Sequence, residues 1–337
     1  MRKTYIIYYE WPSTAGNHAG MAYLFRKLKE WNKKNVRLIK IPTNISKWNS
    51  KIHKLYIYMI IIYLYVITTG KNNIFITEYL CGLDCGNLPL IAKKLQTLGT
   101  KAQLYGLAHL SEKHLLEIYG SDERIKNHLK LLDKIVVFGS SLSEYFNRLG
   151  FDEDKVIVTF HYVENSFYKP IEKTKSQRIK AIAMGNLKRN FENLKAIIAS
   201  TQNVDYHICM GNAKLEDIFS EFKNVTLYGF LNEDKFLHLM QQSDVSISVL
   251  EDTVGSNVIT TSLATGLVQI VSDVGSIRDY LNESNAFICK NNNEFICALK
   301  SLEDSPELLE KMSSSALKQS ETFEIKKFNE FFVELMS

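Results

Sequence analysis

One segment carries residue types that suit an anionic ligand, directly after a predicted strand at residues 244–250. Gly255 lets the backbone come close to a ligand because glycine has no side chain. Ser256 and Asn257 suit the N-cap of the helix that follows, whose first turns, including Val258, carry no acidic residue. The free N–H groups and positive dipole end of such a helix would suit a diphosphate. An ordinary strand–loop–helix connection of a parallel sheet fits the same residues.

A second candidate segment follows the predicted strand at residues 179–184. Gly185 and Asn186 come first, and Lys188 and Arg189 follow them. Arginine binds a phosphate through a bidentate fork, and lysine binds it as a point charge. Release of a diphosphate as a leaving group needs neutralisation of its charge more than it needs covalent chemistry. These two cations could supply it, and they could equally be solvated loop charges.

Two further candidates lie in the first half of the chain. Gly16 and Gly20 bracket Asn17 and His18 in the first predicted strand–helix loop. His109 ends a predicted strand, where an imidazole could orient a hydroxyl or support charge in a transition state. A lone histidine at a strand end is also commonly structural.

The elements that must position these residues alternate between strands and helices along the chain, which predicts parallel sheets with crossover helices. With 337 residues, 45% of them hydrophobic, two domains are expected. We predict two doubly wound Rossmann-like domains facing across a cleft, at residues 1–165 and 166–322. A last helix at residues 323–337, with apolar residues on one face, is expected to pack back on the first domain. In such domains ligands bind at the carboxyl ends of the strands.

The charge is unevenly distributed. Residues 1–165 carry 23 Lys and Arg against 14 Asp and Glu, and the first 71 residues carry 13 against 2. The apolar, tyrosine-rich run at residues 55–68 is shorter than the roughly 20 residues that cross a bilayer, so it predicts either a buried helix or contact with a membrane surface. Anionic lipid headgroups or a phosphate-bearing acceptor suit this basic half better than nucleic acid, for which no motif is present.

The sequence offers little for a metal or a disulfide. Its five cysteines suggest reduced core residues of a cytoplasmic protein, and Cys81 and Cys85 have no second pair with which to hold zinc. Asp152 and Asp154 form the only Asp-x-Asp spacing and are a weak metal candidate. No metal site is therefore predicted.

Several segments in combination resemble the family-4 glycosyltransferases of GT-B fold. In the first half they are residues 138–151 and 155–170, and in the second half they are residues 184–194, 224–236, 240–249, 253–266 and 272–278. The resemblance implies a retaining transfer from a nucleotide sugar, UDP- or GDP-linked, without a tightly bound cofactor. The donor-binding residues that it implies are Gly16, Asn17, His18, Gly185, Asn186, Phe230, Leu231, Glu251, Thr253, Gly255, Ser256, Asn257, Val258 and Thr261. It implies catalytic roles for His109, Lys188 and Arg189.

One departure from that family's pattern concerns its pair of glutamates. Thr253 and Thr261 stand at the positions of the pair, and Glu251 lies two residues before the first. A threonine can make a hydrogen bond to a ribose hydroxyl but not the charge-assisted bonds of a carboxylate.

The sequence thus predicts a glycosyltransferase, of the hexosyltransferase kind, that acts on a glycan or lipid-linked glycan in bacterial surface-polysaccharide (lipopolysaccharide or capsule) synthesis. We expect it in the cytoplasm, with peripheral contact to the inner membrane. A catalytically inactive, glycosyltransferase-like binding subunit is the alternative, and a sugar-nucleotide epimerase of the same fold is a weaker one.

Overall fold

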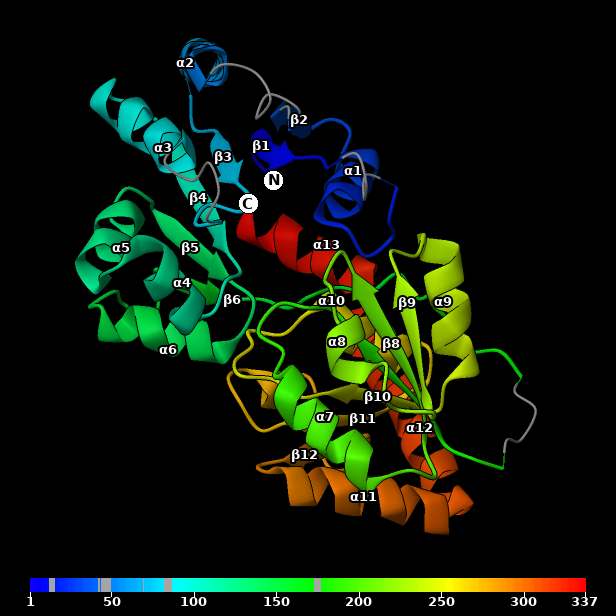
Figure 1. The fold of residues 1–337 in the computed structure, drawn as a ribbon. Coiled ribbons are helices and arrows are strands. Elements are labelled where there is room, and N and C mark those ends of the chain that lie inside the picture. Colours follow the sequence, from blue (N-terminus) through cyan, green and yellow to red (C-terminus); the bar gives the residue numbers. More distant parts are fainter. Residues whose placement is uncertain (12–15, 42, 44–49, 69, 82–86, 173–176) are drawn as a thin grey trace. The chain divides into compact units, whose positions relative to one another are not determined.

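The computed structural model describes residues 1–337 except 12–15, 42, 44–49, 69, 82–86 and 173–176 (Figure 1). Cys85 therefore lies outside the described residues. Contacts divide the chain into two units, Met1–Phe160 with Lys326–Ser337, and His161–Ile325. The second unit begins five residues before the boundary expected from the sequence, because residues 161–165 already bond within it. The backbone N–H of His161 donates to the Tyr280 hydroxyl at 3.0 Å.

The first unit contains a six-stranded sheet in the order β2-β1-β3-β4-β5-β6, with every pair of neighbours parallel. Its strands are β1 (Thr4–Tyr9), β2 (Val36–Ile41), β3 (Asn73–Ile76), β4 (Gln103–Ala108), β5 (Lys134–Val137) and β6 (Val156–Val158). Its helices are α1 (Met21–Trp31), α2 (Ser50–Ile67), α3 (Asn87–Thr97), α4 (Glu112–Tyr119), α5 (Asp122–Leu129) and α6 (Ser140–Arg148). The strand order reverses between β1 and β3, so right-handed crossovers place helices on both faces.

The last helix, α13 (Ile325–Leu335), packs on this first sheet. The Phe332 ring lies edge-on to that of Phe75, with 5.8 Å between centroids. The Asn73 side-chain amide donates to the Met336 carbonyl at 2.9 Å. The end of the chain therefore completes the core of the unit in which the chain begins.

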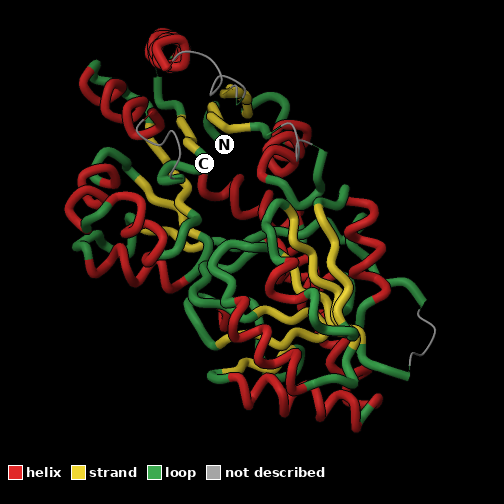
Figure 2. Tube along the Cα trace, in the orientation of Figure 1, coloured by secondary structure: helices red, strands yellow, loops and turns green. Residues whose placement is uncertain are grey.

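The second unit contains another parallel six-stranded sheet, in the order β12-β11-β10-β7-β8-β9. Its strands are β7 (Lys180–Met184), β8 (Asp205–Gly211), β9 (Val225–Gly229), β10 (Val245–Ser248), β11 (Val268–Ser272) and β12 (Ala286–Cys289). Its α-helices are α7 (Phe191–Ser200), α8 (Glu216–Phe219), α9 (Glu233–Gln242), α10 (Asn257–Ala264), α11 (Asn292–Asp304) and α12 (Pro306–Ser320). The tube in Figure 2 shows the strands of this unit with helices on both sides. The α/β fold predicted from the alternation of elements is confirmed.

Helix α2 contains the apolar run at residues 55–68, and only one of its faces is covered. Ile57, Ile61 and Leu64 are buried, whereas Leu55 and Ile62 are 61% and 62% exposed. Among the described residues, no helix is both long enough and apolar enough to cross a membrane.

Candidate functional site

The carboxyl ends of β7 and β10 form the switch point of the second sheet, because the chain winds outward from these neighbouring strands in opposite directions. The loops that follow the two strands are bonded to each other. Asn190 N–H donates to the Val249 carbonyl at 2.9 Å, and Glu251 N–H donates to the Lys188 carbonyl at 3.0 Å. Both predicted anion-binding segments therefore lie at one place in the fold.

The loop after β7 turns sharply at Gly185, whose φ of +81° is readily adopted only by glycine. A Cβ on Gly185 would lie 3.7 Å from Val258 in the first turn of α10, so this loop passes close to the start of that helix. The Asn186 side chain donates to the Met210 carbonyl at 2.7 Å and is thereby fixed to β8. Lys188 has a φ of +52°, a left-handed conformation that is costly for a residue with a side chain.

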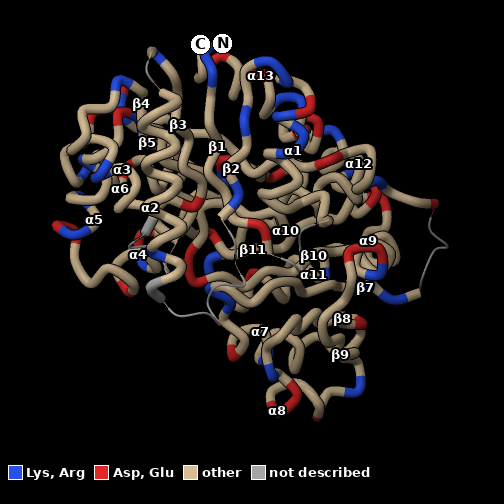
Figure 3. The backbone as a smooth tube through the Cα atoms, turned by 90° about the horizontal axis from the view of Figure 1, so that it is seen from above, with Lys and Arg blue, Asp and Glu red and all other residues tan. Residues whose placement is uncertain are grey.

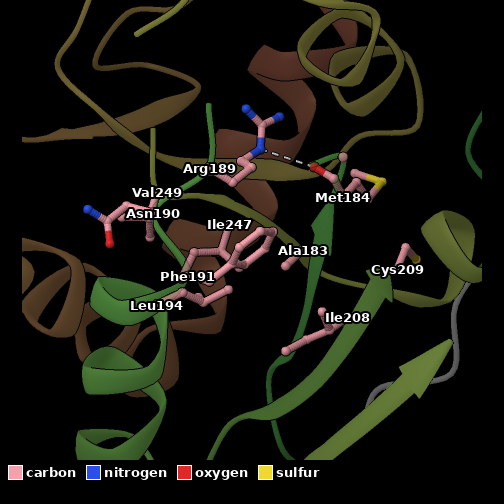
Figure 4. A pocket seen from close by; sticks show the side chains of 11 residues that line it. Ala183, Met184, Arg189, Asn190, Phe191, Leu194, Ile208, Cys209, Ile247 and Val249 are labelled. Carbon is pink, nitrogen blue, oxygen red and sulfur yellow. Dashed lines mark hydrogen bonds between the residues drawn. The ribbon is translucent and has the colours of Figure 1, made fainter. Parts of the chain in front are cut away.

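Arg189, like Lys188, is a partly buried cation of this loop. Its Nε donates to the Met184 carbonyl at 3.2 Å (Figure 4), and its Nη1 donates to the Leu187 carbonyl at 3.4 Å. Burial lowers the pKa of the guanidinium to about 10, so it stays charged at neutral pH. No carboxylate of the described residues pairs with it. A buried charge is normally paired, so Arg189 is suited to an anion from outside the chain.

Apolar side chains lie beneath Arg189 in the pocket of Figure 4, which includes Phe191, Leu194, Ile208 and Ile247. These residues belong to α7, β8 and β10 and are part of, or pack against, the core of the unit. This packing leaves the polar groups of the site at the carboxyl ends of the strands.

The start of α10 offers backbone donors at the same place. Its first turn has no acidic residue, and Ser256 occupies the N-cap without a capping bond from its side chain. The Ser256 Oγ is buried and makes no hydrogen bond within the described part of the chain. Gly255, with a φ of +92°, brings the chain into this helix against the ring of Tyr280. Donor groups and a positive helix end therefore face the same point.

Thr253 and Thr261, which stand at the positions of the family's glutamate pair, make hydrogen bonds to the backbone and do not face solvent. Thr253 Oγ1 accepts from Gly255 N–H at 3.0 Å, and Thr261 Oγ1 donates to the Asn257 carbonyl at 2.7 Å. Both side chains are buried. Glu251 is exposed beside Lys188, and Asn257 bonds to the His161 ring at 3.0 Å.

The residues expected to contact the nucleobase of the donor follow β9, which lies two strands away from β7 in the sheet. Phe230 is 58% exposed, and Leu231 next to it is partly buried. An exposed aromatic ring is a flat surface on which a nucleobase could stack.

The remaining predicted residues belong to the first unit. The carbonyl of Asn17 accepts from Gly20 N–H at 2.9 Å before α1, and the His18 ring lies 4.8 Å from that of Tyr23. Gly16 has no atom within 4 Å of where its Cβ would be. His109 follows β4, and burial lowers its pKa to about 4, so its imidazole is neutral at pH 7.

Sequence reasoning missed two features. One is Glu78, which lies two residues beyond the end of β3 and takes a left-handed conformation with a φ of +49°. Tyr280, which packs on Gly255, was also missed. Neither position has a residue type or spacing that signals its role. Within the described residues, no three His, Cys, Asp or Glu side chains could together hold a metal ion.

Comparison with known proteins shows which family and which folds the chain resembles. Residues 166–319 match the family model described as "Glycosyl transferases group 1". The whole chain has the fold of a sucrose-phosphate synthase from Thermosynechococcus elongatus, with a TM-score of 0.79 at 10% identity over 99% of this chain and 98% of that one. It is also similar to Anabaena HepE in complex with UDP and glucose, with a TM-score of 0.74 at 11% identity over 99% of both chains.

The lipopolysaccharide outer core galactosyltransferase WaaB has the same fold, with a TM-score of 0.68 at 14% identity over 98% of this chain and 99% of that one. The sequence has no match among curated proteins. The structural likenesses show the fold, and the family match covers residues 166–319, which lie within the second unit. Together they define the class of protein, a glycosyltransferase of GT-B fold.

Proposed function

We propose that the switch point of the second unit binds the diphosphate of a nucleotide sugar and that the protein transfers its sugar to a glycan or lipid-linked glycan. The observation that supports this most directly is the Arg189 guanidinium, partly buried beside an α-helix N-terminus and paired with no carboxylate of the described chain. Lys188 and the Ser256 hydroxyl lie in the same two loops. A developing negative charge on the leaving diphosphate would be stabilised there without movement of the protein.

The other donor contacts follow from the same placement. Phe230 and Leu231 would contact the base at the end of β9, while Glu251 would take part in binding the ribose. Since Thr253 and Thr261 bond to backbone atoms, we assign them the role of holding Gly255 and the first turn of α10. His109 and the loop of Gly16, Asn17 and His18 would serve the sugar, as the resemblance implies.

The donor is proposed to be a UDP- or GDP-sugar, and the UDP bound to HepE supports the first. A thermal-shift series with UDP-, GDP-, dTDP- and CMP-sugars tests this. A ligand at about 100 times its dissociation constant stabilises by about 2.7 kcal/mol, which raises the midpoint by several degrees. A shift with one nucleotide series is expected. An absence of any shift would instead favour the inactive binding subunit.

Arg189→Ala provides the matched test of the phosphate site. We expect it to weaken nucleotide binding at least tenfold while the protein stays folded. Arg178→Ala is the control, because Arg178 also donates to a backbone carbonyl, that of Asn203 at 2.9 Å, but lies before β7 at the opposite end of the strand. Equal binding by both variants and the wild type would contradict the proposed site.

We further propose that transfer retains the configuration of the donor sugar, as the family resemblance implies. Slow hydrolysis of the donor in the absence of acceptor allows a direct test by proton NMR. A retaining enzyme releases the sugar first as the anomer present in the donor. Initial release of the opposite anomer would contradict retention.

Contact with a membrane surface is the last part of the proposal, and it rests on α2. The exposed apolar residues of this helix are Ile52, Leu55, Tyr58, Met59, Ile62, Tyr63, Tyr65 and Val66. The exposed Lys54 lies on the same helix, and Figure 3 marks the many other basic residues of the first unit. An apolar helix face with tyrosines and nearby lysines suits an anionic bilayer surface.

Sedimentation with phosphatidylcholine vesicles that contain or lack phosphatidylglycerol tests this contact. We expect binding that increases with the anionic lipid and is lost in a Leu55→Ser, Ile62→Ser, Val66→Ser variant. A concentration-dependent dimer that the same substitutions abolish, without vesicle binding, would show instead that α2 contacts a second copy. Membrane contact from the cytoplasmic side would fit an acceptor of surface-polysaccharide synthesis.

A further inference from the structure

Glu78 occupies the switch point of the first sheet, where the strand order reverses between β1 and β3. Its φ of +49° is a left-handed conformation that is uncommon for a residue with a side chain. Such a conformation costs roughly 1 kcal/mol or more and persists only where neighbouring contacts fix it. Backbone strain of this kind is concentrated at binding sites.

The contacts that fix Glu78 lie on both sides of it. Thr77 N–H donates to the Ile7 carbonyl of β1 at 3.0 Å, and Tyr79 N–H donates to the Leu107 carbonyl of β4 at 2.8 Å. The backbone is therefore bonded to one neighbouring strand just before Glu78 and to the other just after it.

The Tyr79 side chain adds two further anchors. Its hydroxyl donates to the His128 carbonyl at 2.8 Å. Its ring fills the space beside Gly106, where a Cβ would lie 2.9 Å from the ring. Because Tyr79 is buried and fixed in this way, the turn at Glu78 cannot relax without disturbing the core.

The Glu78 carboxylate, although partly buried, makes no hydrogen bond or ion pair with the described residues. Two cations of neighbouring elements, Arg26 of α1 and Lys40 of β2, both pair with Glu10, which follows β1. Burial alone raises the pKa of Glu78 to about 7, and no neighbouring charge contributes. At neutral pH the carboxyl group can therefore either accept or donate a hydrogen bond.

Other polar atoms close to these strand ends are also unsatisfied. Thr77 Oγ1, His109 Nδ1 and Ser111 Oγ are buried and have no hydrogen-bond partner in the described part of the chain. They follow β3 and β4, which are neighbours in the sheet. Buried polar atoms are nearly always hydrogen-bonded, so a group of them at a switch point indicates a ligand that supplies the missing partners.

We propose that Thr77, Glu78 and His109 bind an uncharged, hydroxyl-rich group, a sugar ring, at the carboxyl ends of β3 and β4. The inference rests on the proposed transferase function and narrows it, because sugar hydroxyls can both donate hydrogen bonds to these unsatisfied atoms and accept them, whereas the carboxylate form of Glu78 repels a phosphate. The sugar is either the one carried by the donor or part of the acceptor. Glu78 would contact it directly.

Saturation-transfer NMR on the full chain tests this site with free glucose, galactose, mannose and N-acetylglucosamine, and with glucose 6-phosphate. We expect at least one neutral sugar to bind the wild type and to bind Glu78→Ala at least tenfold more weakly. Glu153→Ala, at an exposed carboxylate of the same unit, should bind like the wild type. Glucose 6-phosphate should bind no tighter than glucose.

Several results would overturn the proposal: no neutral sugar bound by the wild type, unchanged binding by Glu78→Ala, or tighter binding of the phosphorylated sugar. A thermal unfolding scan of Glu78→Ala, expected at or above the wild-type midpoint, separates loss of the site from loss of the fold. Glu78→Gln, which keeps the shape and some hydrogen bonding of the side chain, should retain part of the affinity.

Calorimetric titration with UDP and UDP-glucose distinguishes the two sources of the sugar. If the site holds the donor sugar, Glu78→Ala removes the affinity that UDP-glucose has beyond that of UDP. If it holds the acceptor, the two nucleotides bind the variant as they bind the wild type. Failure of the wild type to bind any nucleotide would count against the proposed function, whereas the response of free sugars to Glu78→Ala tests this site alone.

Discussion

The ring of Tyr280 lies directly against the α-carbon of Gly255, at the point where the chain enters α10. A Cβ on Gly255 would lie 2.3 Å from Cε2 of that ring. The Tyr280 hydroxyl is fixed in turn, because it accepts from His161 N–H at 3.0 Å. The glycine therefore allows a buried aromatic ring to support the turn before the proposed diphosphate site.

Gly255→Ala is expected to destabilise the second unit by about 2–4 kcal/mol, since it combines overpacking against a fixed ring with a left-handed φ of +92°. Chemical denaturation measures the change. Gly229→Ala is the control, because no atom lies within 4 Å of its added methyl group and its φ is not positive. Equal stability of the two variants would mean that Tyr280 does not constrain the loop.

The pKa of Glu78 predicts a pH dependence of stability. The folded protein holds this proton up to about pH 7, whereas the unfolded chain releases it near 4.5. The stability that protonated Glu78 contributes is therefore fully present below pH 4.5 and is lost as the pH rises to 7. The free energy of unfolding falls over this range by on the order of 3 kcal/mol. Glu78→Gln should remove this slope, as measured by denaturation at a series of pH values. A parallel pH profile in the variant would contradict the prediction.

His109 should act in the opposite direction. Burial and the nearby His114 lower its pKa from 6.5 to about 4, so the unfolded chain takes up this proton first as the pH falls. Stability is lost from pH 6.5 down to about 4, again by on the order of 3 kcal/mol. Denaturation of Glu78→Gln at a series of pH values should show this loss of stability at acid pH, because the opposite effect of Glu78 is removed in that variant. The loss should disappear in the double variant Glu78→Gln, His109→Gln.

Backbone strain at Glu78 can be separated from the cost of burying its charge. Glu78→Gly removes both, whereas Glu78→Gln keeps the left-handed conformation. We expect the free energy of unfolding of the glycine variant to be about 1 kcal/mol higher than that of the glutamine variant. This difference is the usual cost of a left-handed conformation for a residue with a side chain. Denaturation at pH 8 compares them. If glycine is the less stable of the two, the strain at this position is negligible.

Neighbouring residues of α2 should differ sharply in their contribution to folding. Ile61 is 2% exposed and Ile62 is 62% exposed. Ile61→Ala should cost about 2–5 kcal/mol, whereas Ile62→Ala should change stability by no more than about 0.5 kcal/mol. A large cost for Ile62→Ala in the absence of lipid would mean that another part of the protein covers this face.

Local patterns were enough to predict the fold, because alternation of apolar strands and amphipathic helices is a property of neighbouring residues. The same patterns drew attention to the segments around Lys188 and Gly255, because glycine permits unusual backbone conformations and N-cap residues favour the start of a helix. They could not show that Thr261 bonds within its own helix or that Glu78 takes a left-handed conformation just beyond β3. Those features depend on contacts between residues far apart in the sequence, such as Tyr79 with Leu107 and His128.

The packing of α13 on the first sheet also determines the order in which the two units can be finished during synthesis. Domains usually fold as they emerge from the ribosome, the N-terminal one first. Here the first sheet must wait for Phe332 and Met336, which leave the ribosome after all of the second unit. The unit that begins the chain is therefore the last to be completed, and until then the side of its sheet that α13 covers, including Phe75, is open to chaperones.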